Sequence, residues 1–362
     1  MADGSRTTVQ YAGAARPGII LALAAAALFG LSIPFSKLLL GDASPVLVAG
    51  LLYCGSGLGL FVLRLSTGRR GSEARLSTRD FPWLAAALLF GGVLGPILLM
   101  WGLRSTAASA ASLLLNLEGV FTTALAWSVF RENFDRRVAL GMVLIVAGGV
   151  LLSRSAPGGL AMPAGSLALV GACLCWAIDN NLTQKVSGGD PLQIAAIKGV
   201  VAGSVNVTAA FFLGSQAPSA GLAVGAAIVG FLGYGISLAF FVAALRHLGT
   251  ARTGAYFSVA PFVGAVLSLA MFGEPLRPEL MGAALLMGFG VWLHLSEHHH
   301  HAHEHEPLAH DHRHLHDEHH RHRHGEDDPP GEPHAHAHVH EPLVHTHPHY
   351  PDLHHRHHQR RP

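Results

Sequence analysis

Long apolar runs constrain this chain more than any other feature. Between residues 18 and 296, mainly apolar stretches follow one another, and the charged residues of this region stand mostly between them. A helix needs about 20 such residues to cross the hydrocarbon core of a bilayer. The sequence therefore predicts an all-α membrane protein with about ten transmembrane helices. The predicted spans are 18–39, 46–65, 81–103, 107–130, 138–153, 165–186, 192–213, 222–246, 250–273 and 278–296.

The composition agrees with this class of protein and argues against several others. Hydrophobic residues make up 50% of the 362 residues and charged residues only 13%, which is too little charge to cover the surface of a soluble protein of this length. The chain contains no Gly-x-x-x-x-Gly-Lys-[Ser/Thr] loop, no His-Glu-x-x-His and no Gly-x-Ser-x-Gly. ATP-driven pumps, zinc proteases and serine hydrolases are therefore disfavoured. We expect that the protein is not an enzyme and that it does not bind nucleic acid.

The positive charges near the span ends predict the orientation. If the N-terminus is cytoplasmic, thirteen Lys and Arg residues fall on the cytoplasmic side, and four fall outside, namely Lys37, Arg104, Arg154 and Arg277. Cytoplasmic loops carry the excess of Lys and Arg in membrane proteins. The sequence thus predicts a multi-pass protein of the cytoplasmic membrane with both termini in the cytoplasm.

The chain repeats itself at half length. Phe130-Arg131-Glu132-Asn133 closes the fourth predicted span, and Phe272-Gly273-Glu274-Pro275 closes the ninth. Lys37 ends the first span, and Lys185 ends the sixth. Five spans in each half force the two halves into opposite orientations. Inverted repeats that meet near the bilayer midplane are a recurrent plan of secondary transporters.

Several local motifs carry a resemblance to a known family. Trp176-Ala177, Ala260-Pro261 eleven residues before Phe272, and the two Phe-x-Glu closures resemble the drug/metabolite transporter superfamily, in particular its EamA-type domain. The resemblance implies transport of small organic solutes without ATP, commonly as export coupled to an ion gradient. One departure is that the first half has Glu118-Gly119 where the second half has Ala260-Pro261.

The resemblance covers about residues 18–296 and divides the chain into four parts. We expect a cytoplasmic N-terminus (1–17), a first EamA-type five-helix repeat (18–153), a second (165–296), and a His-rich cytoplasmic tail without regular structure (297–362).

Three ionisable residues lie deep in the predicted spans: Glu118, Asp179 and Lys198. An intramembrane charge costs several kcal/mol on insertion scales, so it usually faces a partner or a wet cavity. Asp179 and Lys198 lie at about the same depth, roughly 10 Å from the cytoplasmic boundary. They could form a structural ion pair or line a transport cavity. Glu118 has no cation at its depth and is a candidate substrate or proton site; the alternative is a neutral, hydrogen-bonded carboxyl that only packs.

Asparagines add polar groups beside these charges. Asn116 lies two residues before Glu118 and so faces roughly the other side of the helix, and Asn180 follows Asp179 directly. The candidate substrate and proton pathway therefore comprises Glu118, Asp179, Lys198, Asn116 and Asn180.

The tail has its own chemistry, since residues 298–362 hold 25 of the 27 histidines. Imidazole suits Zn, Ni, Cu and Co, so we expect the tail to bind such ions, although transport itself requires no cofactor. The candidate ligands follow His-x-His spacing: His310, His312, His314, His316, His334, His336, His338 and His340. Two alternative functions follow, a divalent transition-metal transporter and a metal-responsive membrane sensor. The expected partners are a small-molecule substrate, the lipid bilayer and divalent metal ions, with a homodimer as a further option.

Overall fold

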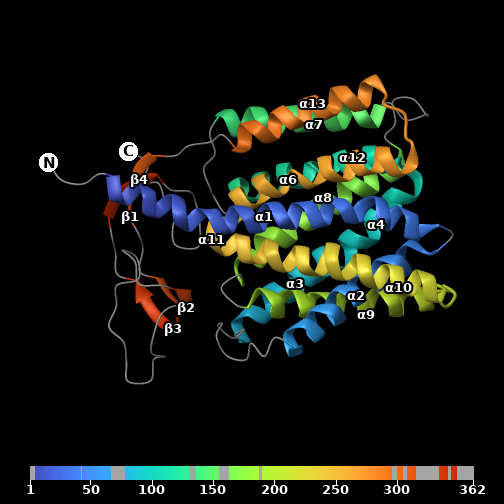
Figure 1. Ribbon diagram of the computed structural model, residues 1–362, viewed down its shortest axis with the longest axis horizontal. Coiled ribbons are helices and arrows are strands. Elements are labelled where there is room, and N and C mark those ends of the chain that lie inside the picture. Colours follow the sequence, from blue (N-terminus) through green and yellow to red (C-terminus); the bar gives the residue numbers. More distant parts are fainter. Residues whose placement is uncertain are drawn as a thin grey trace.

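The computed structural model describes most of the membrane part and four short pieces of the tail. The described residues are 5–41, 43–66, 78–129, 136–154, 163–186, 190–295, 300–304, 308–314, 334–340 and 344–348. The candidate ligand His316 lies outside them. Figure 1 shows the helices of residues 5–295 lying roughly side by side in one bundle, with the described tail segments at the end that carries the N-terminus.

Each half of the bundle has its own set of helices. The first half holds α1 (Ser5–Leu40), α2 (Pro45–Ser66), η1 (Thr78–Asp80), α3 (Phe81–Ala87), η2 (Leu88–Leu94), α4 (Gly95–Ser105), α5 (Ala108–Leu114), α6 (Leu117–Ser128) and α7 (Arg136–Arg154). The second half holds α8 (Ala164–Gln184), α9 (Pro191–Phe212), α10 (Ala220–Val229), η3 (Gly230–Ile236), α11 (Ser237–Phe257), α12 (Ala260–Phe272) and α13 (Pro278–Leu295).

The helices confirm an all-α membrane protein. Within the described residues, nine helical segments are long and apolar enough to cross a bilayer. They do not include α8, which has 21 residues but carries Asp179, Asn180 and Asn181. Because α8 packs along α4 and α6 in the bundle, it corresponds to the sixth predicted span and brings the total to ten. One boundary differs from the prediction, since α11 continues through the turn expected between the eighth and ninth spans.

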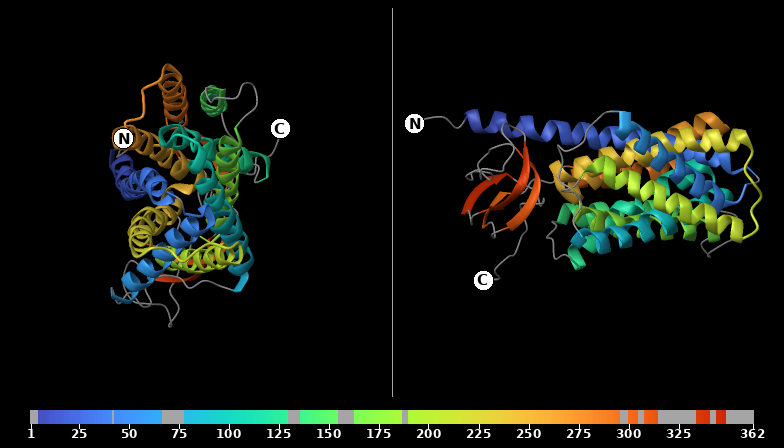
Figure 2. Two further views of the ribbon diagram at one scale, coloured as in Figure 1. Left: turned by 90° about the vertical axis from the view of Figure 1, so that its right-hand side faces the viewer. Right: turned by 90° about the horizontal axis from the view of Figure 1, so that it is seen from below.

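The packing obeys the predicted two-fold relation between the halves. In that relation, the first to fifth spans correspond to the sixth to tenth. The helix pairs α2·α9 and α7·α13 each join corresponding spans, and both are in contact. The contact of α1 with α11 is matched by that of α8 with α4, and the contact of α1 with α12 by that of α8 with α6. Seen end-on in Figure 2, α7 and α13 lie together at one edge of the bundle.

The α2·α9 contact is close because glycines form it. A Cβ added to Gly57 would lie 2.2 Å from the backbone nitrogen of Val200, and one added to Gly199 would lie 2.4 Å from the nitrogen of Gly57. Small residues of this kind let helix backbones approach within a membrane, where dispersion contacts drive association. The glycines of α2 and α9 thus account for the close approach of the two helices.

Both halves interrupt their helices at corresponding places. The third and eighth spans each contain a π-helical segment, η2 and η3, and both segments are rich in glycine. The fourth span breaks between α5 and α6 at Leu115-Asn116, and the ninth breaks between α11 and α12 at Ser258-Val259. The first break forms without a proline, whereas Pro261 follows the second break. Asn116 takes over part of the role of a proline at the first break, because its side-chain amide donates to the carbonyl of Leu113, 3.1 Å away.

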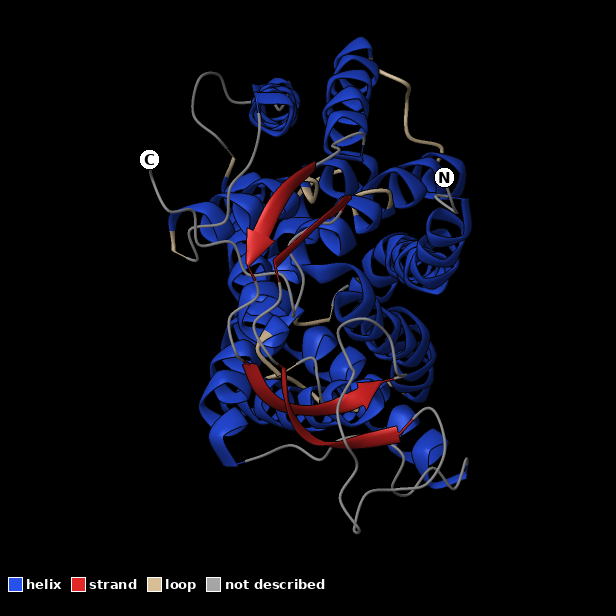
Figure 3. Ribbon diagram, turned by 90° about the vertical axis from the view of Figure 1, so that its left-hand side faces the viewer, coloured by secondary structure: helices blue, strands red, loops and turns tan. Residues whose placement is uncertain are grey.

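The tail differs from the predicted lack of regular structure. Strand β1 (His300–Glu304) pairs antiparallel with β4 (Val344–Pro348), and β2 (Leu308–His314) pairs with β3 (His334–His340). Figure 3 shows both pairs across one end of the bundle. The alternating sequence His-Ala-His-Ala-His-Val-His has the period of two of a strand, which composition alone does not reveal.

Candidate functional site

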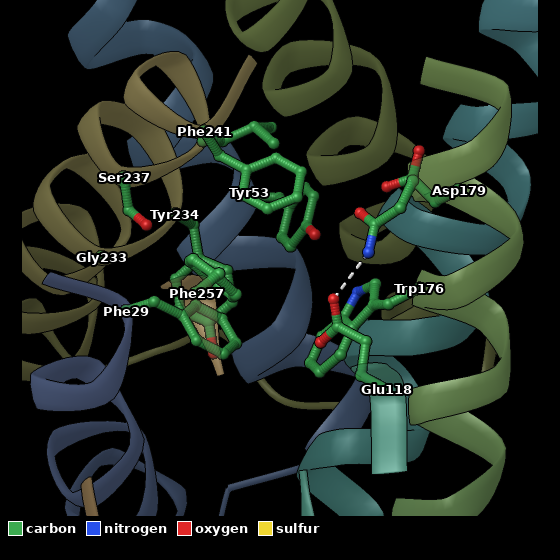
Figure 4. Close-up of a pocket in the computed structure, with 12 residues that line it drawn as sticks. Phe29, Tyr53, Glu118, Trp176, Asp179, Gly233, Tyr234, Ser237, Phe241 and Phe257 are labelled. Atoms are coloured by element: carbon green, nitrogen blue, oxygen red, sulfur yellow. Dashed lines mark hydrogen bonds between the residues drawn. The ribbon is translucent and has the colours of Figure 1, made fainter. Parts of the chain in front are cut away.

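A cavity lined by aromatic and polar side chains lies between the two halves. Its volume of about 60 Å³ exceeds the roughly 10–15 Å³ that one water needs, so it can hold several waters. Helices α1, α2 and α6 of the first half and α8, η3 and α11 of the second half contribute its walls (Figure 4). The lining residues are Phe29, Tyr53, Glu118, Trp176, Asp179, Asn180, Gly233, Tyr234, Ser237, Leu238, Phe241 and Phe257.

Glu118 stands at the first turn of α6, directly after the helix break. The amide nitrogen of Asn180 donates a hydrogen bond to its Oε1 at 2.8 Å, drawn as the dashed line in Figure 4. A helix N-terminus favours a nearby carboxylate, so the break stabilises negative charge here. Glu118 also lines a second, smaller cavity with Thr122 and Pro261. Among the described residues, no cation pairs with Glu118.

Asp179, by contrast, has its own cation. The ammonium group of Lys198 lies 2.6 Å from Oδ1 and 2.7 Å from Oδ2 of Asp179, and the Thr183 hydroxyl donates to Oδ1 at 2.8 Å. The side chain of Lys198 is 1% exposed and that of Asp179 8%. Gly91 makes room for this carboxylate, because an added Cβ there would lie 1.8 Å from Oδ2. Asp179 faces the cavity, whereas Lys198 is not among the lining residues.

Aromatic rings form most of the remaining wall, and none of them is among the site residues predicted from the sequence. Phe29 contacts Trp176, Tyr234 and Phe257, with ring centroids 5.6, 5.7 and 5.4 Å apart. Tyr53 and Phe241 extend the cluster at either side. These residues come from five helical segments in both halves of the chain: α1, α2, α8, η3 and α11. The only signal in the sequence was that four of the rings sit near the middle of predicted spans, namely those of Phe29, Tyr53, Trp176 and Tyr234.

The five candidate residues separate into groups. Glu118, Asp179 and Asn180 lie together at the cavity, and Lys198 lies behind Asp179. Asn116 lies elsewhere, since its amide contacts the carbonyl of Leu113 and the sulfur of Met287. Asn116 therefore serves the helix break rather than the cavity.

One end of the bundle is held by a polar clamp, formed by Lys37, Glu274 and the termini of α4 and α5. This is the end at which α1 finishes, opposite the N-terminus (Figure 1). Lys37 donates to the carbonyl of Leu103, 2.8 Å away, and to that of Thr106. Glu274 follows α12 and accepts from the backbone nitrogens of Ala108 at 2.8 Å and Ser109 at 3.1 Å. The clamp therefore joins the two halves.

Replacing Glu274 with alanine is expected to destabilise this end. The substitution leaves the backbone donors of Ala108 and Ser109 without their acceptor, which costs roughly 1–3 kcal/mol. The midpoint of thermal unfolding in detergent should fall. Arg277→Ala, an exposed change in the same loop, is the control. Equal midpoints for the two variants would show that the clamp adds no stability.

A comparison with known protein families decides what kind of molecule carries this site. The family model described as "EamA-like transporter family" matches residues 16–154 and again residues 163–296. The chain belongs to the EamA-like transporter family. The two matches confirm the predicted family and its two repeats, and they make this protein a membrane transporter.

Individual relatives of this EamA-like transporter agree. An "Uncharacterized transporter" of Methanothermobacter thermautotrophicus is 28% identical over 75% of this chain and 84% of its own length. A "Probable amino-acid metabolite efflux pump" of Salmonella typhimurium is 25% identical over 76% of this chain and 93% of its own. A crystal structure at 17% identity aligns with a TM-score of 0.60 and covers 78% of this chain and 95% of that one, which supports the fold alone.

A shorter relative matches part of the EamA-like transporter. A "Probable 4-amino-4-deoxy-L-arabinose-phosphoundecaprenol flippase subunit ArnE" of Pseudomonas fluorescens is 33% identical over 31% of this chain and 95% of its own length. The part of the chain that the structure describes contains no group of three or more His, Cys, Asp or Glu residues placed to hold a metal ion.

Proposed function

We propose that this protein exports small organic solutes by proton-coupled secondary transport across the cytoplasmic membrane, with the cavity as its substrate site. The observation that carries the proposal is the place of Glu118: a carboxyl without a described cation partner, at a helix break, in a cavity lined by both repeats. A site between two repeats changes its exposure when the repeats rock against each other.

The coupling follows from the cost of charge in this place. A carboxylate in a low-dielectric cavity is stable when it binds a proton or a cationic partner, and unstable when it has neither. Rocking would expose Glu118 to each side in turn, so that it takes up a proton on one side and releases it on the other. Export fits the relative from Salmonella typhimurium, whose name describes it as an efflux pump.

The test is transport into inside-out vesicles. An imposed pH gradient should drive uptake of solutes from a chemically diverse library in vesicles with this protein, and dissipating the gradient should abolish the uptake. Uptake of a solute that persists without any ion gradient, at the same final concentration ratio, would refute coupling.

The proposed topology places both termini in the cytoplasm and the clamp of Lys37 and Glu274 outside. Its basis is the bias of thirteen positive charges against four. Reporter fusions at Arg75 and after Glu297 should both give cytoplasmic signals, and a fusion at Arg277 should give an external one. An external signal at Arg75 would overturn the topology.

We propose in addition that the His-rich tail binds Zn, Ni, Co or Cu ions apart from the transport site. The register supports this, because His310 pairs with His338, His312 with His336, and His314 with His334 across β2 and β3. One ion takes several imidazole ligands, and the register places histidines of the two strands opposite one another. A tail of this kind could regulate transport or buffer metal, whereas no described cluster favours the metal-transporter alternative.

Deleting residues 298–362 is expected to separate the two properties. Binding of Zn²⁺ by the purified protein should be lost, since 25 of the 27 histidines go with the tail. Uptake of the organic solute in vesicles should stay within about twofold of the full-length rate, because the cavity residues all precede residue 298. Complete loss of uptake by a correctly folded, inserted variant would contradict separate roles.

A further inference from the structure

We infer that the cavity selects organic monocations, that is, amines or quaternary ammonium compounds with an apolar body, over neutral and anionic solutes. The inference rests on the proposed function, since it names the substrate class of the same site. Three observations carry it: which hydrogen-bond donors are already engaged, where the charges lie, and how the rings are arranged.

The donors at the cavity wall are engaged by the protein. The Tyr53 hydroxyl donates to the carbonyl of Gly91 at 2.7 Å, and the Trp176 indole nitrogen donates to the same carbonyl at 3.1 Å. That carbonyl lies in η2, where the backbone nitrogen of Gly95 donates to Phe90 instead and the next residue, Pro96, has no N–H to donate. Both polar tips are therefore fixed at the wall, and only the ring surfaces remain for a ligand.

The other polar groups of the cavity wall are also engaged by hydrogen bonds within the protein. The Asn180 amide nitrogen donates to Glu118 and Thr122, and the Ser237 hydroxyl donates to the carbonyl of Ala25 at 2.8 Å. The Tyr234 hydroxyl shares a 3.5 Å contact with Ser36. An anion or a zwitterion entering the cavity would lose its hydration without finding free donors, which is costly for a charged group.

The charges at the cavity favour a cation over an anion. Two carboxylates line the cavity, and the ammonium group of Lys198, which is buried, lies behind Asp179 and bonds to both of its oxygens. This pair is neutral as a unit. The carboxylate of Glu118 accepts one described hydrogen bond, from Asn180, and no described cation balances it. When Glu118 is ionised, the cavity therefore carries one uncompensated negative charge.

The rings complete a site for a cation with apolar substituents. Phe29 stands edge-on to Trp176 at an interplanar angle of 83° and to Tyr234 at 75°, and Phe241 stands edge-on to Phe257 at 71°. Such contacts fix the rings relative to one another before a ligand arrives. Ring faces attract ammonium groups through their quadrupole, most strongly when water is excluded. A cation would find π faces around it and Glu118 as its counter-ion.

The experiment compares three probes of similar shape by calorimetry on the purified full-length protein in lipid nanodiscs. Benzyltrimethylammonium is the cation, neopentylbenzene is its uncharged isostere, and phenylmethanesulfonate is an anion. We expect the cation to bind at least roughly tenfold more tightly than the isostere, and the sulfonate not to bind detectably. Equal affinities for cation and isostere, or tighter binding of the sulfonate, would overturn the inference.

Variants identify the groups responsible. Glu118→Gln keeps the size and a hydrogen-bonding partner for Asn180, and it should weaken cation binding at least roughly tenfold while leaving the isostere unchanged. Phe29→Leu should also weaken cation binding. Glu279→Gln, which removes a carboxylate remote from the cavity lining, should change nothing.

The same variants separate this inference from the proposed function. Proton-driven transport of a neutral or anionic solute that still depends on Glu118 would reject the cation class and leave the transport function standing. Tight, Glu118-dependent binding of the cation without any gradient-driven uptake would support the substrate class and reject coupled transport.

Discussion

Replacing Glu118 with glutamine is expected to lower proton-driven transport at least roughly tenfold at unchanged expression and to flatten its pH dependence. Glutamine keeps the shape of the side chain and can still accept from Asn180, but it cannot exchange a proton. Because Glu118 lines both described cavities without a described cation, its protonation is the step that coupling would require. The initial rate of uptake in vesicles, measured across a range of pH, tests this.

Two comparisons make the result specific to the proton. Glu279→Gln removes a carboxylate outside both cavities and should keep the normal rate and pH profile. Glu118→Asp, which restores a titratable group one methylene shorter, should regain part of the pH dependence even if the rate stays low. A normal rate and pH profile for Glu118→Gln would show that the carboxyl only packs.

Removing one partner of the buried ion pair is expected to be the most destabilising change. Lys198→Met leaves the carboxylate of Asp179 without its cation at a place where its side chain is 8% exposed. Breaking a buried pair in this way costs about 3–5 kcal/mol, because the remaining charge keeps its desolvation penalty. The midpoint of thermal unfolding in detergent and the yield of monodisperse protein should both drop sharply.

The double variant Asp179→Asn with Lys198→Met should recover part of that loss. Removing both charges costs less than leaving one of them buried alone, and asparagine can still accept from the Thr183 hydroxyl. Arg104→Met, at an exposed site on α4, controls for the loss of a positive charge. A double variant as unstable as Lys198→Met would show that the packing of the lysine chain matters more than the charge.

The sequence alone determined the architecture. Apolar runs long enough to span a bilayer recur along residues 18–296, and a helix satisfies its backbone hydrogen bonds internally, as the hydrocarbon core requires. The repeated Phe-x-Glu closures and five spans in each half predicted two repeats, which the family matches confirm. The cost of intramembrane charge also singled out Glu118, Asp179 and Lys198 before any contact was known.

The tertiary structure decided how those residues are used. Counting residues gives the depth of Asp179 and Lys198 in the membrane but not the direction of their side chains. Their pairing was therefore one of two open alternatives. The direction of a side chain around its helix depends on local winding, and two π-helical segments change that winding midway along spans that read as ordinary helix. The helix break before Glu118 likewise has no proline to announce it.

The aromatic wall depended on the tertiary structure most of all. Phe29, Tyr53, Trp176, Tyr234 and Phe257 come from both repeats and meet only where those repeats pack. Within a bilayer an aromatic ring can pack against lipid as well as against protein. A single sequence therefore does not separate lipid-facing rings from rings that line a cavity. Apolarity fixes which segments enter the membrane, whereas helix rotation and packing fix which of their side chains face the solute.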